Sequence, residues 1–109
     1  LKLREGIWYL WRKAYKVKPG TSKQAAEILE KIGVGYQKAG QRSETRVYWS
    51  GYTVPGPANT VYMDWIQEII DSPYREQNVI PDMSELASQL REVAEESSIE
   101  FYEMVQSRA

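Results

Sequence analysis

Asp64 is the residue of this sequence whose type and position best suit acid–base chemistry. It stands inside TVYMDWI, residues 60–66, a run of strand-forming residues in which aspartate is disfavoured. A buried carboxylate needs a charged or hydrogen-bonding partner, and Arg12 on a neighbouring strand has a suitable length. Two interpretations remain open: a general base in an aromatic pocket, or a structural ion pair or subunit contact.

Two residue types are missing from the sequence, and their absence limits the chemistry. The chain has no histidine, so it lacks the commonest metal ligand and the usual general base near neutral pH. It has no cysteine, which excludes disulfides and zinc–thiolate sites and leaves the compartment open. We therefore expect no metal site and no cofactor.

Length and composition predict one folded domain over residues 1–109. A hydrophobic content of 42% is enough for one core. No run of about 18 apolar residues is present, so we expect no transmembrane helix. The first residues, LKLREGIWYLWRK, carry charges throughout, which is not typical of a signal peptide. The expected location is cytoplasmic.

The charges are distributed unevenly along the chain. Residues 1–50 hold 11 Lys and Arg against 4 Asp and Glu, whereas residues 51–109 hold 3 against 11. Such asymmetry indicates either a basic arm for nucleic acid or two halves whose charges pair on folding. The basic residues are interspersed among strand and helix patterns, which favours pairing.

The strands that must position these residues follow from residue type and spacing. Residues 6–18 are rich in aromatic and β-branched side chains and apolar on both faces, which predicts a central strand. Residues 44–54 and 60–66 predict two more strands. Between them, PGPAN at residues 55–59 predicts a reversal longer than a two-residue hairpin. Residues 99–105 alternate in polarity and predict a fourth strand, with a continued helix as the alternative.

Two helices are predicted between the strands. Thr21 or Ser22 is expected to cap the first helix, and Gly40 to end it. The second is expected to start at Asp82, which forms a capping-box spacing with Glu85, and to end near residues 96–97. Its connection to the third strand, residues 67–81, predicts irregular structure. The apolar stripe of the first helix comprises Ala25, Ile28, Leu29, Ile32 and Tyr36.

The resulting order is β-α-β-β-α-β. Two interleaved right-handed β-α-β crossovers give a four-stranded antiparallel sheet with both helices on one face, the ferredoxin-like α+β fold. The other face carries large side chains whichever strand parity it presents. The two alternative sets are Tyr48, Tyr52, Tyr62, Leu10 and Tyr102, or Trp49, Trp65, Trp11 and Phe101. A second copy, a nucleic acid or a ligand is expected to cover such a face.

Three stretches of the chain resemble the dimeric α+β barrel superfamily, which includes the antibiotic-biosynthesis monooxygenases, the stress-responsive A/B barrels and the NIPSNAP-like proteins. They are YKVKPGTSKQAAEIL, SETRVYWSGYTVPGPANTVYMDW and IEFYEMV. The resemblance covers nearly the whole chain through patterns of residue type and spacing. It implies a homodimer whose two sheets pack face to face, with a small pocket between sheet and helices in each subunit.

The chemistry that the resemblance implies is narrowed by the missing histidine, which the haem-binding and cyclase members of the superfamily need. Cofactor-independent oxygenation remains, in which Asn, Trp and Tyr side chains hold a phenol or its anion near oxygen. The candidates of matching type are Asn59 and Trp65, beside Asp64, as catalytic residues, and Tyr48, Tyr62 and Arg12 as ligand-binding residues. The alternative is a non-enzymatic structural or ligand-binding dimer, in which these residues form a turn and a core.

An RNA-binding function is disfavoured by two observations. The third predicted strand, TVYMDWI, lacks the basic-Gly-aromatic pattern by which sheets of this topology stack bases. A sequence pI near 5.5 also supplies no basic surface. The expected partners are therefore a second copy and a small aromatic or hydrophobic molecule, with no nucleic acid and no membrane.

Overall fold

The computed structural model describes residues 8–40, 42–68 and 81–105. The elements follow the predicted order, and the sheet order is β2-β3-β1-β4 with every neighbouring pair antiparallel. The ferredoxin-like α+β fold is confirmed. The elements are β1 (Tyr9–Val17), α1 (Ser22–Lys38), β2 (Arg46–Ser50), β3 (Thr60–Gln67), α2 (Ser84–Val93) and β4 (Ala94–Glu103).

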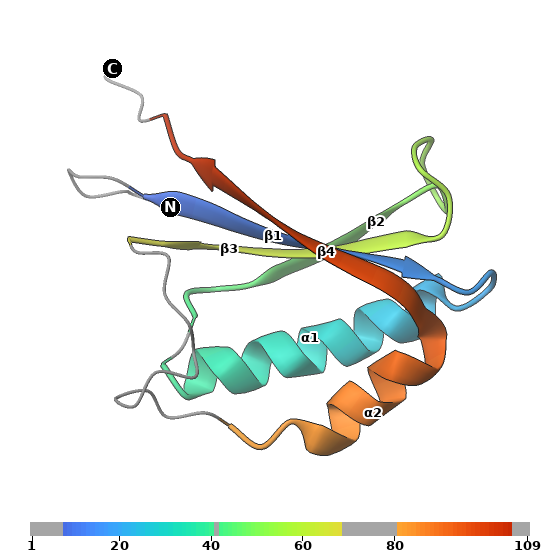
Figure 1. The fold of residues 1–109 in the computed structure, drawn as a ribbon, viewed down its shortest axis with the longest axis horizontal. Coiled ribbons are helices and arrows are strands. Elements are labelled where there is room, and N and C mark those ends of the chain that lie inside the picture. Colours follow the sequence, from blue (N-terminus) through green and yellow to red (C-terminus); the bar gives the residue numbers. More distant parts are fainter. Residues whose placement is uncertain (1–7, 41, 69–80, 106–109) are drawn as a thin grey trace.

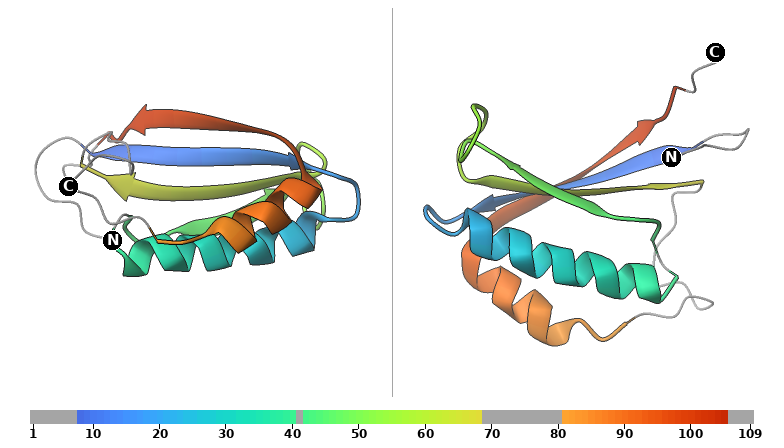
Figure 2. Two further views of the ribbon diagram at one scale, coloured as in Figure 1. Left: turned by 60° about the horizontal axis from the view of Figure 1, so that its bottom comes forward. Right: turned by 180° about the vertical axis from the view of Figure 1, so that it is seen from behind.

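The molecule has two layers, with both helices on the same side of the sheet (Figure 1). Figure 2 shows the same arrangement from two further directions, with α1 and α2 side by side under the strands. β1 is central because it pairs with β3 on one edge and β4 on the other, as its apolar character on both faces predicted. β2 and β4 are the edge strands.

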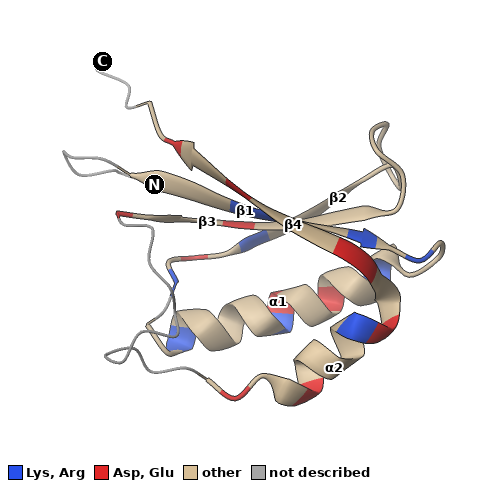
Figure 3. Ribbon diagram, in the orientation of Figure 1, with Lys and Arg blue, Asp and Glu red and all other residues tan. Residues whose placement is uncertain are grey.

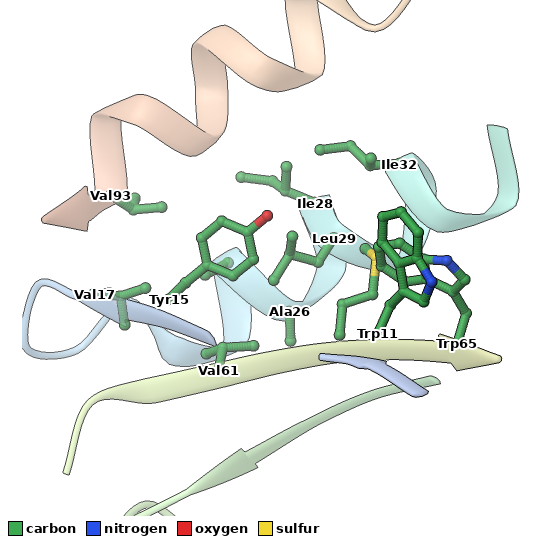
Figure 4. Packing of buried hydrophobic residues seen from close by; sticks show 12 residues of the cluster. Trp11, Tyr15, Val17, Ala26, Ile28, Leu29, Ile32, Val61, Trp65 and Val93 are labelled. Carbon is green, nitrogen blue, oxygen red and sulfur yellow. The ribbon is translucent and has the colours of Figure 1, made fainter. Parts of the chain in front are cut away.

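The core lies between the sheet and the helices (Figure 4). Odd-numbered residues of β1, β2 and β3 point into it, because successive side chains of a strand alternate between its faces. Leu29 of α1 and Val17, Val61 and Met63 of the strands are the largest side chains that are fully buried. The even-numbered residues of β1, β2 and β3, and those of β4 after Ala94, form the opposite surface, here called the outer face, which neither helix covers.

Several predicted boundaries are corrected by the structure. β2 spans only Arg46–Ser50, because the chain leaves the ladder at Gly51, whose φ of 67° begins the loop. α2 ends at Val93, and β4 starts at the next residue and ends at Glu103. The strand prediction for residues 99–105 was therefore right in type, but the strand begins earlier and ends two residues sooner. Residues 6–7 of the first predicted strand and most of the predicted connection at 67–81 lie outside the described residues.

The structure corrects both predicted helix caps: Thr21 has the predicted position but makes no cap bond, and the cap of α2 lies one residue later than predicted. Thr21 precedes α1 without a side-chain cap bond, because its hydroxyl donates instead to the carbonyl of Lys18 at 2.6 Å. At α2 the cap residue is Met83, and Asp82 accepts bonds from the amide and the hydroxyl of Ser84 at 3.1 and 2.8 Å. These two bonds lower the pKa of the exposed Asp82 carboxyl. The helices are therefore held chiefly by their apolar faces.

The two halves of the chain pair charges across the sheet. Arg12 of β1 forms an ion pair with Glu100 of β4, and Arg46 of β2 forms one with Asp64 of β3. In each pair the basic residue comes from the first half and the acidic residue from the second. Figure 3 shows Lys and Arg interspersed with Asp and Glu over both layers. The described pairs thus agree with charge pairing between the halves.

Candidate functional site

Four of the six predicted site residues meet on the outer face. The β2–β3 register places Tyr48 opposite Tyr62, and the β1–β3 register places Arg12 opposite Asp64. The rings of Tyr48 and Tyr62 are stacked with centroids 5.2 Å apart. The Arg12 guanidinium lies over the Tyr62 ring, 4.3 Å from its centroid. These side chains form one continuous polar and aromatic cluster, here called the outer-face cluster.

Asp64 is the buried centre of this cluster, with 4% of its surface exposed. Its Oδ1 accepts a hydrogen bond from Nε of Arg46 at 2.8 Å, and its Oδ2 accepts one from the Tyr48 hydroxyl at 2.7 Å. The expected ion pair between Asp64 and Arg12 is wrong. Arg12 instead lies 3.5 Å from a carboxylate oxygen of Glu100.

The hydrogen bonds and the burial of these side chains shift the pKa values of Tyr48, Arg46 and Arg12. Burial, followed by the hydrogen bond to Asp64, raises the pKa of Tyr48 to about 12. The bond to Asp64 is also the main cause that raises the pKa of Arg46. Burial works against the charge of Arg12, yet attraction from Tyr48 and Glu100 leaves its pKa raised. Both oxygens of Asp64 are thus engaged by groups that keep their protons near neutral pH.

Asn59 lies apart from the cluster, at the end of the loop that joins β2 to β3. It is the only described non-glycine residue with positive φ, at 52°, a conformation that asparagine tolerates well. Its carbonyl accepts a bond from the amide of Val17 at 2.8 Å. The described contacts of Asn59 are those of a turn residue that ties the loop to the end of β1.

Trp65 lies on the opposite face of the sheet from Asp64, inside the core. Its ring stacks on that of Trp11, with centroids 5.4 Å apart and an interplanar angle of 29° (Figure 4). Phe101 of β4 meets Trp11 edge to face at 4.8 Å. The indole N–H of Trp65 donates to Gln67 at 2.7 Å. The buried indole N–H of Trp11 finds no acceptor in the described part of the chain.

An arginine completes this core-side group, here called the tryptophan cluster. The guanidinium of Arg42 lies 4.0 Å from the centroid of the Trp65 ring and 4.0 Å from that of Tyr36 on α1. It also contacts the sulfur of Met63 at 3.3 Å. A positive charge is therefore held against aromatic faces, an arrangement worth about 1–2 kcal/mol when it is partly desolvated.

Sequence reasoning missed Arg46 and Arg42. The position of Arg46 could have been found by counting back from the loop, because a register that pairs Ser50 with Thr60 also pairs Arg46 with Asp64. Arg42 precedes β2 and follows α1, so no periodic pattern places it. Only the close approach of helix and sheet brings it to Trp65.

The described residues contain no group of three or more Asp or Glu side chains that could hold a metal ion. No helix within residues 8–40, 42–68 or 81–105 is long and apolar enough to span a membrane.

Comparison with known proteins shows which folds this chain shares. No protein-family model matches it, and no curated protein does so. Among solved structures, a NIPSNAP family protein from Agrobacterium tumefaciens superposes with a TM-score of 0.64 and 12% identity, covering 96% of this chain and 92% of that one. A NIPSNAP-like domain protein from Burkholderia xenovorans superposes with a TM-score of 0.65 and 18% identity, covering 94% of this chain and 88% of that one.

A third structure extends the likeness to a second group. A candidate antibiotic biosynthesis monooxygenase from Chloroflexus aurantiacus superposes with a TM-score of 0.61 and 14% identity, covering 94% of this chain and 95% of that one. The resemblance to antibiotic-biosynthesis monooxygenases and NIPSNAP-like proteins is thus confirmed at the level of the fold, with no single family assigned. At sequence identities this low, the roles of residues in those proteins cannot be transferred to residues of this chain.

Proposed function

We propose that this protein binds a small planar aromatic molecule beside Trp11, in a pair of chains whose outer faces pack together. The observation that carries the proposal is the unpartnered indole N–H of Trp11. A buried donor without an acceptor costs about 1–3 kcal/mol, so such groups call for an explanation. A phenol or quinone oxygen bonded to this N–H would remove that cost.

The surroundings of Trp11 support an aromatic ligand. Its ring lies between Trp65 and Phe101, and Phe101 is 42% exposed on the core-side surface of β4. A planar ring can stack or pack edge to face on such side chains, at about 0.5–1.5 kcal/mol for each ring pair. The positive charge of Arg42 over Trp65 further favours an electron-rich or anionic ring.

Self-association is supported by the outer face. Neither helix covers it, and Tyr48 and Tyr102 remain 37% and 45% exposed there. Exposed aromatic side chains on the open side of a sheet are typical of a surface that another chain covers. The Arg12–Glu100 and Arg46–Asp64 pairs already satisfy charges on this face, so a second copy would meet few unpaired ones.

The enzymatic form of this proposal is oxygenation without a metal. It is favoured by the fold shared with a candidate antibiotic biosynthesis monooxygenase and by a sequence without histidine or cysteine. In such a reaction an electron-rich ring carbon of a phenol gains one atom of O₂ and becomes C=O, which converts the phenol to a quinone. The other oxygen atom leaves as water with the hydrogen of that carbon and the hydrogen of the phenol hydroxyl. Asp64 is not placed to act as its base, because it faces away from Trp11 and has both oxygens bonded.

The binding test is a fluorescence titration with a panel of quinols and phenols, since the chain has four tryptophans. We expect saturable quenching with a Kd of roughly 1 μM to 1 mM. Trp11→Phe keeps an aromatic ring and removes the N–H, so the affinity should fall about tenfold, or ~1.4 kcal/mol. The matched control is Trp49→Phe, whose indole N–H already donates to Thr53 in the loop.

The outcomes separate the alternatives. Steady-state oxygen uptake with the same quinols would support the enzymatic form, and binding without uptake would leave a ligand-binding protein. If no member of the panel binds, and Trp11→Phe only lowers stability, the tryptophan cluster is simply core. The non-enzymatic structural dimer would then be the better description.

A further inference from the structure

A groove of about 270 Å³ opens at the β2 edge of the sheet, lined by Ser43, Glu44, Arg46, Trp65 and Ile66. It exists because the two strands of the hairpin differ in length. β2 starts at Arg46, opposite Asp64, so the last residues of β3 extend past it.

The hydroxyl of Ser43 closes the strand edge beyond the ladder. It accepts a bond from the amide of Ile66 at 3.2 Å and donates to the carbonyl of the same residue at 2.6 Å. One side chain thus replaces a missing ladder step and anchors the chain that leads into β2. The groove lies between this anchor and Arg46. Hydrogen bonds to β3 therefore hold the groove at both ends, through Ser43 at one and through Arg46 at the other.

Two opposite charges line the groove without contacting each other. Arg46 uses only its Nε, for Asp64, and its two terminal nitrogens bond to nothing in the described chain, while 62% of its side chain is exposed. Glu44 has no hydrogen bond or ion pair with the described residues either, although it is near enough to add to the attraction that Arg46 experiences after that of Asp64. The terminal nitrogens of Arg46 and the carboxylate of Glu44 are thus both open to a ligand, while the Arg46 charge is shared with Asp64.

We propose that this groove binds a free apolar α-amino acid. Its carboxylate would lie on the terminal nitrogens of Arg46, its ammonium on Glu44 and its side chain against Trp65 and Ile66. A zwitterion matches one fixed cation and one fixed anion, whereas a simple acid or amine leaves one charge of the groove opposed or unpaired. Asp64 holds the Arg46 guanidinium by Nε, which leaves the forked end to bind a carboxylate.

The test compares three probes with one ring and different charges: L-phenylalanine, 3-phenylpropionate and phenethylamine. The readout is the indole N–H signal of Trp65 in an ¹⁵N-labelled sample, assigned with Trp65→Phe. We expect saturable shifts with L-phenylalanine and at least tenfold weaker binding of the two probes that lack one charge. Equal binding of all three, or no saturable shift at Trp65, would overturn the proposal.

A variant of Glu44 tests the charge matching directly. Glu44 is exposed and unbonded in the described chain, so Glu44→Gln should fold normally. Glu44→Gln should weaken the binding of L-phenylalanine about tenfold and leave the affinity for 3-phenylpropionate unchanged or higher. The variant should therefore lose the preference for the zwitterion. Glu27→Gln, at an exposed position of α1, is the matched control and should preserve that preference. A preference that survives in Glu44→Gln would also count against the proposal.

Discussion

At the scale of single residues, the outer-face cluster depends on one buried carboxylate. Asp64 is 4% exposed, and its two oxygens accept from Arg46 and Tyr48. A buried charge is tolerated only where partners replace its hydration, so removal of either partner leaves an uncompensated group. The carboxylates of the two ion pairs on this face differ in exposure: the Glu100 side chain is 43% exposed, and the Asp64 side chain is 6% exposed.

The first prediction concerns the charge of Asp64. Asp64→Asn should lower the free energy of unfolding by about 1–3 kcal/mol, because Arg46 loses its anion and a buried amide replaces an acceptor. Urea unfolding measures this loss. Glu100→Gln, in the more exposed pair, should stay within about 0.5 kcal/mol of the original protein. Equal effects of the two substitutions would show that Asp64 is solvated rather than buried.

The second prediction concerns the Tyr48 hydroxyl and pH. Its pKa is about 12 in the folded protein, against an ordinary value of 10.0. Because the folded state favours the neutral phenol, the stabilisation is complete below about pH 10 and is lost as the pH rises through 12. Since Tyr48 is partly exposed, we expect a loss of only ~1 kcal/mol.

The measurement is stability against pH for the original protein and for Tyr48→Phe. Their difference should shrink between about pH 10 and 12. Tyr52→Phe is the control, because Tyr52 lies in the loop after β2 and is 58% exposed. A difference between Tyr48→Phe and the original protein that does not vary with pH would contradict the role of this hydroxyl.

At the scale of elements, short strands and tight loops determine where side chains meet. β2 has five residues and β3 has eight, so the hairpin is uneven and its loop begins early, at Gly51. Gly51 has φ of 67°, and its amide bonds to the carbonyl of Val54 at 3.0 Å. The register that this loop sets is the one that places Arg46 opposite Asp64.

The third prediction compares two glycines with similar backbone angles. A side chain at Gly20, with φ of 83°, would meet nothing within 4 Å, so Gly20→Ala should cost about 1–2 kcal/mol for the left-handed conformation alone. At Gly51 a Cβ would also lie 2.5 Å from the carbonyl oxygen of Pro57. Gly51→Ala should therefore cost more, about 3 kcal/mol, in urea unfolding. If both substitutions lower the free energy of unfolding equally, the loop after β2 can move enough to accommodate the added methyl group.

At the scale of the whole molecule, two helices cover one face of a four-stranded sheet and leave the other face uncovered. The helix-covered face holds the tryptophan cluster, and the outer face holds Tyr48, Tyr62 and the two ion pairs. The proposed ligand site and the proposed self-association surface thus lie on opposite sides of the same strands, so substitutions can alter each one separately.

The fourth prediction is self-association through the outer face. Light scattering at micromolar concentration should give about twice 12.6 kDa. Tyr102→Glu places a charge on the outer face and should yield the monomer. Val34→Glu, at a 48% exposed position of α1, is the matched control and should remain paired. A monomer for the original protein across the micromolar range would contradict the proposal, as would loss of pairing in both variants.

The order of the elements could be read from the sequence because it depends on local periodicity. The two-residue alternation of strands and the apolar stripe of α1 are properties of short segments, and they predicted the ferredoxin-like fold correctly. Element ends were less predictable. The Thr21 hydroxyl donates to the Lys18 carbonyl instead of accepting from a helix amide, and Asp82 bonds the first amide of α2 although the cap residue is Met83. The exclusion of histidine and cysteine chemistry likewise needed nothing beyond composition.

Only the tertiary structure decided which strand face meets the helices and which partner Asp64 takes. Alternation shows that Arg46 and Tyr48 share a face of one strand and that Tyr62 and Asp64 share a face of the next, but not whether either face lies in the core. The choice depends on how whole helices pack on the sheet, and it placed Trp65 inside and Asp64 outside. Arg12 and Arg46 both lie on strands beside Asp64, and side-chain geometry across the finished sheet selects Arg46, because its Nε reaches the carboxylate at 2.8 Å while Arg12 turns to Glu100 and Tyr62.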